Sequence, residues 1–149
     1  MSSQACVDAS LLIRTLIPGP FSDRALLLVQ RWQGEKVRLF APALLAFEVT
    51  STLRRLVYLG EITAVEGEEA LTRFLQMDIS LSSRRDIFPL AWRLAQELNR
   101  PRAYDTAYLA LAKLLDCNFW TADERLYNAA CSKLSSVKWL GSATWAAEG

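Results

Sequence analysis

Four carboxylates in this sequence hold positions from which they could reach one site: Asp8, Glu48, Asp105 and Asp123. Two unit charges about 4 Å apart at an effective dielectric of about 20 repel each other by about 4 kcal/mol. A pocket with several carboxylates therefore binds divalent cations or raises the pKa of one acid. The sequence has no histidine, which excludes Ser-His-Asp and Cys-His catalysis and leaves carboxylates, hydroxyls, Lys and Arg for the chemistry. The chain is a candidate metal-dependent enzyme.

Each of these acids also has a purely structural interpretation. Asp105 and Asp123 fall in the first turns of predicted helices, where the helix macrodipole stabilises an anion. Glu48 could be a solvated helix residue, and Asp8 a turn residue whose carboxylate binds nearby backbone N–H groups. Taken singly, each acid is explained by these roles. The positions of all four together favour a shared site.

Composition narrows the class of protein. The chain has 149 residues, 52% of them hydrophobic, which predicts a single domain over residues 1–149 with a substantial core. Its 17 basic and 16 acidic residues argue against a strong field for holding duplex DNA. Cys6, Cys117 and Cys131 lack the paired spacing of zinc or iron–sulfur sites, so we expect reduced thiols. No apolar stretch approaches the roughly 20 residues of a membrane span, and no basic leader precedes one, so a soluble, cytoplasmic protein is expected.

Apolar runs alternate with helical periodicity along the chain. Strands are predicted at residues 4–7, 37–40, 79–81, 117–120 and 137–140. Helices are predicted at residues 10–16, 23–33, 42–60, 64–77, 87–98, 101–115 and 124–130. This alternation predicts an α/β fold with right-handed crossovers and a mainly parallel sheet covered on both faces.

Several residues predict where the helices begin. Ser10 and Asp86 can act as N-caps, and Pro42 and Pro101 suit a first helical turn. Capping boxes are predicted at residues 63–66 and 121–124. The helices at 42–60 and 64–77 are expected to pair as a helical hairpin.

These elements predict where the acids meet. In an open parallel sheet, ligands bind outside the carboxyl ends of the strands, and Asp8 and Asp123 each follow a predicted strand. Asp105 is expected to extend a buried helix stripe with Leu109 and Ala112 rather than to face water. Glu48 similarly shares a helix face with Leu44, Leu45 and Thr52. All four carboxylates are therefore expected in one pocket at this edge.

In four segments, the sequence resembles the PIN-domain nucleases and, within them, the small VapC-like toxin ribonucleases. The segments are residues 7–10, 42–55, 104–112 and 121–126. The resemblance implies a PIN-like three-layer sandwich with a mainly parallel sheet of four to five strands flanked by helices. It also implies that Asp8, Glu48, Asp105 and Asp123 are the catalytic and metal-binding acids, with Ser10 and Thr121 lining the pocket.

The activity implied by this resemblance is that of an endoribonuclease that hydrolyses RNA phosphodiester bonds with Mg²⁺ or Mn²⁺, as the toxin of a toxin–antitoxin pair. Both cations prefer hard oxygen ligands. The substrate would be single-stranded or loop RNA. Candidate phosphate contacts are Arg14, Arg54, Arg55, Arg100 and Arg102. Each arginine could equally be solvated or paired with a carboxylate.

The predicted helical hairpin carries more apolar side chains than a small core should absorb: Leu56, Val57, Tyr58, Leu59, Phe74 and Leu75. Such an excess usually marks an interface. By resemblance we expect a homodimer and a small antitoxin protein that inserts a basic side chain among the carboxylates. The alternative is that these residues pack the hairpin onto the domain.

Other functional classes fit less well or stay open. A haloacid-dehalogenase-like phosphatase needs a second Asp two residues after the first acid, where this chain has Ser10. A dinucleotide-binding module needs a glycine-rich turn after its first strand, and none follows Asp8. A catalytically silent PIN-fold binding scaffold and a housekeeping RNA-processing nuclease remain alternatives.

Overall fold

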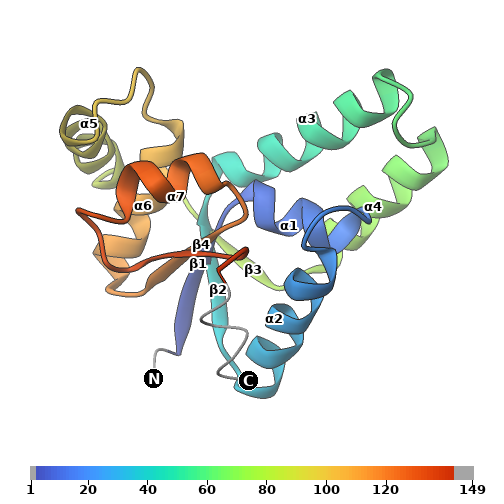
Figure 1. Cartoon of the computed structure of the whole chain (residues 1–149), viewed down its shortest axis with the longest axis horizontal. Helices are drawn as coiled ribbons and strands as arrows, with labels where there is room; N and C mark the ends of the chain where they lie inside the picture. Colours follow the sequence, from blue (N-terminus) through green and yellow to red (C-terminus); the bar gives the residue numbers. More distant parts are fainter. Residues whose placement is uncertain (1–2, 143–149) are drawn as a thin grey trace.

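The structure, a computed structural model, describes residues 3–142. In this range five strands alternate with seven helices (Figure 1). The strands are β1 Gln4–Val7, β2 Arg38–Pro42, β3 Ile79–Ser82, β4 Asn118–Thr121 and β5 Val137–Trp139. The helices are α1 Ala9–Leu16, α2 Ser22–Gly34, α3 Leu44–Tyr58, α4 Ala64–Gln76, α5 Ile87–Glu97, α6 Tyr104–Leu115 and α7 Glu124–Ala130.

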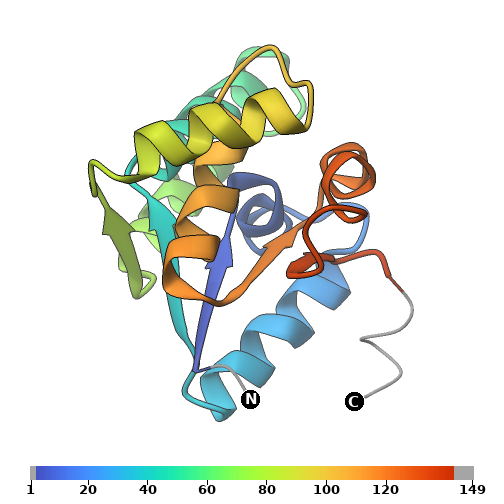
Figure 2. The same ribbon diagram turned by 90° about the vertical axis from the view of Figure 1, so that its left-hand side faces the viewer.

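The five strands form one sheet in the order β3-β2-β1-β4-β5, and every pairing is parallel. Strand β1 is therefore central, with Cys6 opposite Phe40 of β2 and Phe119 of β4. Helices α1 and α2 cover one face of the sheet, and α6 with α5 packed on it covers the other (Figures 1 and 2). The predicted α/β sandwich with a parallel sheet is confirmed.

The core lies where the helices meet the central strands. Val7, Leu11 and Phe119 are completely buried. Seven consecutive residues of α6, from Thr106 to Ala112, are also buried, as expected for a helix that is apolar nearly all round. Cys6 and Cys117 are buried free thiols, whereas the free thiol of Cys131 is only half-buried. Within residues 3–142 no helix has the length and hydrophobicity needed to span a membrane.

Two predicted helix starts are wrong, one because a strand takes the residue and the other because of how the preceding helix ends. Pro42 does not open α3; it is the last residue of β2 and pairs with Ser82 of β3. Pro101 does not open α6. Asn99 adopts a left-handed conformation with φ of 52°, and the Arg100 N–H closes the end of α5 on the carbonyl of Ala95, which leaves Pro101 in a loop.

Helix caps differ from expectation at the site edge. The N-cap of α1 is Asp8 rather than Ser10. The second capping box does not form, because Asp123 caps α7 and the Thr121 hydroxyl bonds to Asp8. Asp86 holds the N-cap position of α5 without a side-chain cap bond and pairs with Arg84 instead.

The predicted helical hairpin of α3 and α4 is present and extends away from the sheet (Figure 1). Helix α3 ends at Tyr58 rather than at Gly60, which follows with φ of 75°. The capping box of α4 forms as predicted, between Thr63 and Glu66. Gly67 faces α3 so closely that a Cβ there would lie 2.6 Å from Val57 Cγ2. A glycine therefore allows the two helices to pack this tightly.

Candidate active site

The four acids predicted from the sequence line one cavity of about 650 Å³ at the carboxyl edge of the sheet. Asp8 lies between β1 and α1, Glu48 on α3, Asp105 in the first turn of α6, and Asp123 at the N-cap of α7. Four separate elements thus each contribute one carboxylate. The expected convergence on one pocket is observed.

Asp8 is the most enclosed of the four, with 7% of its surface exposed. Its Oδ1 accepts hydrogen bonds from Ser10 Oγ at 2.7 Å and from the Leu11 N–H at 3.1 Å. Its Oδ2 accepts one from Thr121 Oγ1 at 2.6 Å. Burial raises the pKa of Asp8 to about 6, although these hydrogen bonds oppose the rise and the charge of Asp105 adds to it.

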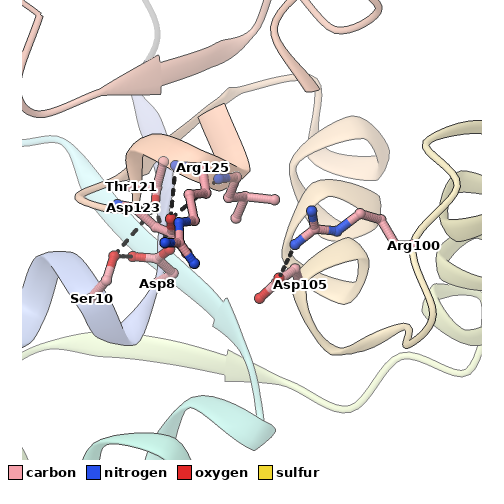
Figure 3. A network of polar contacts seen from close by, with 8 residues as sticks. Asp8, Ser10, Arg100, Asp105, Thr121, Asp123 and Arg125 are labelled. Atoms are coloured by element: carbon pink, nitrogen blue, oxygen red, sulfur yellow. Dashed lines mark hydrogen bonds and ion pairs between the residues drawn. The ribbon is translucent and has the colours of Figure 1, made fainter. Parts of the chain in front are cut away.

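Two hydroxyls tie Asp8 to the end of β4 (Figure 3). Thr121 Oγ1 also accepts the Asp123 N–H at 3.0 Å, and Ser10 Oγ accepts the Ala122 N–H at 3.0 Å. The two hydroxyl oxygens lie 3.2 Å apart. Ser10 lines the cavity, whereas Thr121 is completely buried behind Asp8 and is not in the cavity wall. This network fixes the start of α1 against the start of α7.

Glu48 is half-buried and receives a hydrogen bond from the hydroxyl of Tyr108 on α6. Burial, followed by the charge of Asp105, raises the pKa of Glu48, and the Tyr108 hydrogen bond opposes this. The pKa of Tyr108 is raised well above its ordinary value by burial and by Glu48, so its hydroxyl stays a donor. Tyr108 was not among the site residues predicted from the sequence. Its spacing of three residues from Asp105, which places both on one helix face, is the signal that identifies it.

Asp105 and Asp123 are more open to solvent. Asp105 is less buried than expected, with 41% of its side chain exposed, and forms an ion pair with Arg100 across 3.1 Å (Figure 3). Asp123 uses Oδ1 to accept the N–H groups of Arg125 and Leu126 at 3.0 and 3.2 Å. Capping α7 therefore engages one carboxylate oxygen of Asp123. Within residues 3–142 the other oxygen, Oδ2, accepts no hydrogen bond.

The donor chemistry of the cavity fits a hard divalent cation, because its wall carries the four predicted acids and no imidazole. A fifth acid, Glu61 in the turn between α3 and α4, also lines the cavity and was not predicted from the sequence. The side chains of these acids are not gathered around one point. In the described part of the chain, no three His, Cys, Asp or Glu side chains are placed to hold a single ion. All four predicted acids are engaged by protein partners, including Asp105 by Arg100 and Glu48 by Tyr108.

The five candidate arginines do not form one group. Arg14 lines the cavity, and Arg100 pairs with Asp105. Arg54, Arg55 and Arg102 are exposed and lie outside the cavity wall. The guanidinium of Arg54 lies 5.9 Å from the ring centre of Tyr58 on the same helix.

Comparison with known proteins identifies the family. The sequence pattern of the PIN domain matches residues 6–139. The chain belongs to the PIN-domain family. This PIN domain is 35% identical over 89 residues to a VapC ribonuclease of Mycobacterium bovis and to ribonuclease VapC9 of Mycobacterium tuberculosis, a match that covers 60% of this chain and 68% of each relative.

Solved structures share the PIN-domain fold at low sequence identity. A toxin–antitoxin complex from Klebsiella pneumoniae contains a chain with a TM-score of 0.65 and 18% identity, over 91% of this chain and 97% of that one. A protein of Pyrobaculum aerophilum matches with a TM-score of 0.63 and 19% identity, over 85% of this chain and 84% of its own. These likenesses concern the fold.

Proposed function

We propose that this PIN domain is a metal-dependent endoribonuclease that hydrolyses RNA phosphodiester bonds in the cytoplasm. One observation carries the proposal: four carboxylates from four elements line a single cavity at the carboxyl edge of the sheet. The similarity to proteins named VapC ribonucleases supports RNA as the substrate. The absence of histidine leaves carboxylates as the reactive groups.

Asp8, Glu48, Asp105 and Asp123 are the residues that would hold Mg²⁺ or Mn²⁺. A divalent cation bound there supplies a Lewis acid for the phosphate and lowers the pKa of a water molecule. Ser10 and Thr121 contribute by fixing the Asp8 carboxylate through bonds of 2.7 and 2.6 Å. Arg100 engages only Oδ2 of Asp105, so Oδ1 would be the oxygen that holds the cation while the ion pair persists.

Arginines near the cavity are the proposed contacts for RNA phosphates. Arg14 is the best placed, since it lies in the cavity wall itself. Further cations around it are supplied by Arg54, Arg55, Arg100 and Arg102. Contacts from these arginines to phosphates would position the RNA without reading its base sequence. The net charge of +1 means that such contacts hold RNA weakly and briefly.

Cleavage of a fluorescent single-stranded RNA by the purified protein tests the activity. We expect cleavage only with Mg²⁺ or Mn²⁺ and none in excess EDTA. Asp105→Asn should lower the rate by at least about 100-fold, the upper end of what losing an outer-shell partner costs. Asp116→Asn is the control, because Asp116 ends α6 outside the cavity and Asn tolerates its left-handed φ of 51°.

Cleavage that continues in EDTA, or full activity of a folded Asp105→Asn variant, would contradict the mechanism. A protein that binds RNA or a protein partner in the presence of metal but never cleaves RNA would instead support the silent scaffold.

We further propose that this nuclease is the toxin of a toxin–antitoxin pair, inhibited by a small protein that places a basic side chain among the four carboxylates. The ion pair between Arg100 and Asp105 supports the chemistry, because a guanidinium already occupies one of these acids. Expression alone should arrest growth, and co-expression of a small neighbouring open reading frame should restore it. Harmless expression would favour a housekeeping RNA-processing nuclease.

A homodimer is the third part of the proposal, and the structure offers two exposed apolar surfaces for partners. On the α3–α4 hairpin, Tyr58 and Leu59 are exposed at the turn, and Leu75 is exposed at the far end of α4. Phe74, which the sequence grouped with them, is buried. On α5, Phe88 and Trp92 are 67% and 68% exposed, one turn apart. We assign the hairpin to the antitoxin and α5 to the second copy.

A further inference from the structure

Tyr108 combines a rigid position with a polar atom aimed at the acids. Only 2% of its surface is exposed. Its ring packs against Phe119 of β4, with centroids 5.9 Å apart and the planes tilted by 38°. Its hydroxyl reaches the cavity, of which Tyr108 forms part of the wall, and donates a hydrogen bond to Oε1 of Glu48.

The position of the Glu48 carboxylate depends on this one hydrogen bond, whereas the Asp8 carboxylate is held by three. Asp8 receives hydrogen bonds from Ser10, Leu11 and Thr121, two of them near it in sequence. Within residues 3–142, the carboxylate of Glu48 receives a hydrogen bond from Tyr108 alone, a residue 60 positions away. Glu48 also has more rotatable bonds than Asp8, so holding its carboxylate in one place costs more conformational entropy.

We propose that Tyr108 is a positioning residue that acts through Glu48: its hydroxyl fixes one carboxylate oxygen and leaves the other oxygen to bind the divalent cation. The inference rests on the proposed metal-dependent function. The hydroxyl also fixes α6, which carries Asp105, to α3 at the level of the cavity. Outer-shell donors that orient metal ligands work in this way in other metal sites.

The test measures Mn²⁺ affinity directly, by titration calorimetry or by the electron paramagnetic resonance signal of free Mn²⁺. Tyr108→Phe keeps the packed ring and removes only the hydroxyl. It should weaken Mn²⁺ binding about 10-fold, the lower end of the usual cost of losing an outer-shell partner. The control is Tyr127→Phe, because Tyr127 stacks on Trp139 away from the cavity and its hydroxyl should not influence binding.

Repeating the substitution in a Glu48→Ala protein distinguishes a positioning role of the Tyr108 hydroxyl from a role in packing. In a Glu48→Ala protein the hydroxyl has no carboxylate to hold, so adding Tyr108→Phe should change the remaining Mn²⁺ affinity by less than about 2-fold. Equal losses in both backgrounds would show that the hydroxyl only supports packing and would overturn the inference. So would unchanged affinity in the single variant. A wild-type protein that binds no Mn²⁺ would refute the proposed metal site itself, which is a distinct result.

Discussion

The carboxylate of Asp8 is both a helix cap and part of the cavity wall. It caps α1 through the Leu11 N–H, and it lies in the wall of the cavity with both oxygens engaged by hydroxyl groups. Burial raises its pKa to about 6, so the metal-free protein carries this charge at neutral pH at a cost in folding free energy. That cost is typical of a group kept for chemistry rather than for stability.

The first prediction concerns the pH dependence of that cost. The pKa of Asp8 rises from 3.8 to about 6 on folding, so between these values the folded state binds more protons than the unfolded state. The contribution of Asp8 to stability is therefore greatest below about pH 4, falls as pH rises through 6, and is constant above it. Asp8→Asn removes this dependence and should gain up to about 3 kcal/mol relative to wild type between about pH 4 and pH 7.

Urea unfolding of the metal-free proteins across this pH range measures the difference. Parallel pH profiles for wild type and Asp8→Asn would contradict the raised pKa. The same variant should fold yet fail to cleave RNA, which separates the stability of the site from its activity.

The second prediction compares two completely buried threonines. Thr121 donates to Asp8 Oδ2 at 2.6 Å, and Thr106 donates to the Ala91 carbonyl at 2.8 Å. Replacing either by Val removes a buried hydrogen bond, so each variant should lose about 1 kcal/mol of stability. Only Thr121→Val should also weaken RNA cleavage, because only Thr121 holds an acid of the cavity. Equal effects of the two variants on the cleavage rate would refute a specific role for Thr121.

At the scale of elements, local sequence signals predict which helices and strands form, and tertiary hydrogen bonds determine at which residues they begin and end. Alternating apolar runs predict the strands, and the α4 capping box is correct because Thr63 and Glu66 are exposed and satisfy only each other. The same pattern fails at Thr121, since a buried carboxylate 113 residues away takes its hydroxyl. Pro42 fails as a helix start because β3 pairs with it. No local pattern reveals such partners.

The third prediction tests the close packing of α3 and α4. A methyl group at Gly67 would lie 2.6 Å from Val57 Cγ2, so Gly67→Ala should lose about 1 kcal/mol or more despite the better helix propensity of Ala. Gly34→Ala is the control, since Gly34 ends α2 with no atom within 4 Å of the added methyl group, and it should be neutral or stabilising.

Adding Val57→Ala to Gly67→Ala should restore part of the loss, because it removes the atom in conflict. Chemical unfolding of the three variants measures these changes. A Gly67→Ala protein as stable as wild type would show that the hairpin adjusts freely.

At the scale of the whole molecule, the sequence predicts which acids meet but not how they are held. Two of the acids follow strands, and the parallel sheet brings strand ends to one edge. The spacing of Tyr108 from Asp105 gives its helix face but not its partner Glu48, which follows from the placement of α6 against α3. The contact of Arg100 with Asp105 follows from the loop after α5. The exposed pair Phe88 and Trp92 was not predicted, because the apolar residues of α5 follow the spacing of a helix with one buried face.

The fourth prediction concerns association. Light scattering of the purified protein should give the mass of a dimer. Trp92→Glu should yield a folded monomer, because it places a charge on the apolar surface of α5. Leu75→Glu is the matched control, with 70% exposure on the hairpin, and should remain a dimer. A monomeric wild type, or a dimer lost only in Leu75→Glu, would contradict the assignment of the two surfaces.

The sheet order has a consequence for how the protein is made. The central strand β1 is synthesised before the other four strands of the sheet, and its neighbour β4 follows more than a hundred residues later. Asp8 and its partner Thr121 are 113 positions apart. A nascent chain can pair β1 with β2 early, but it has no assembled acid cavity until β4 and the first turn of α7 have emerged. Contacts this distant also form slowly. Interrupted translation therefore releases fragments without a complete cavity, and only molecules translated beyond the first turn of α7 can bring the four acids together.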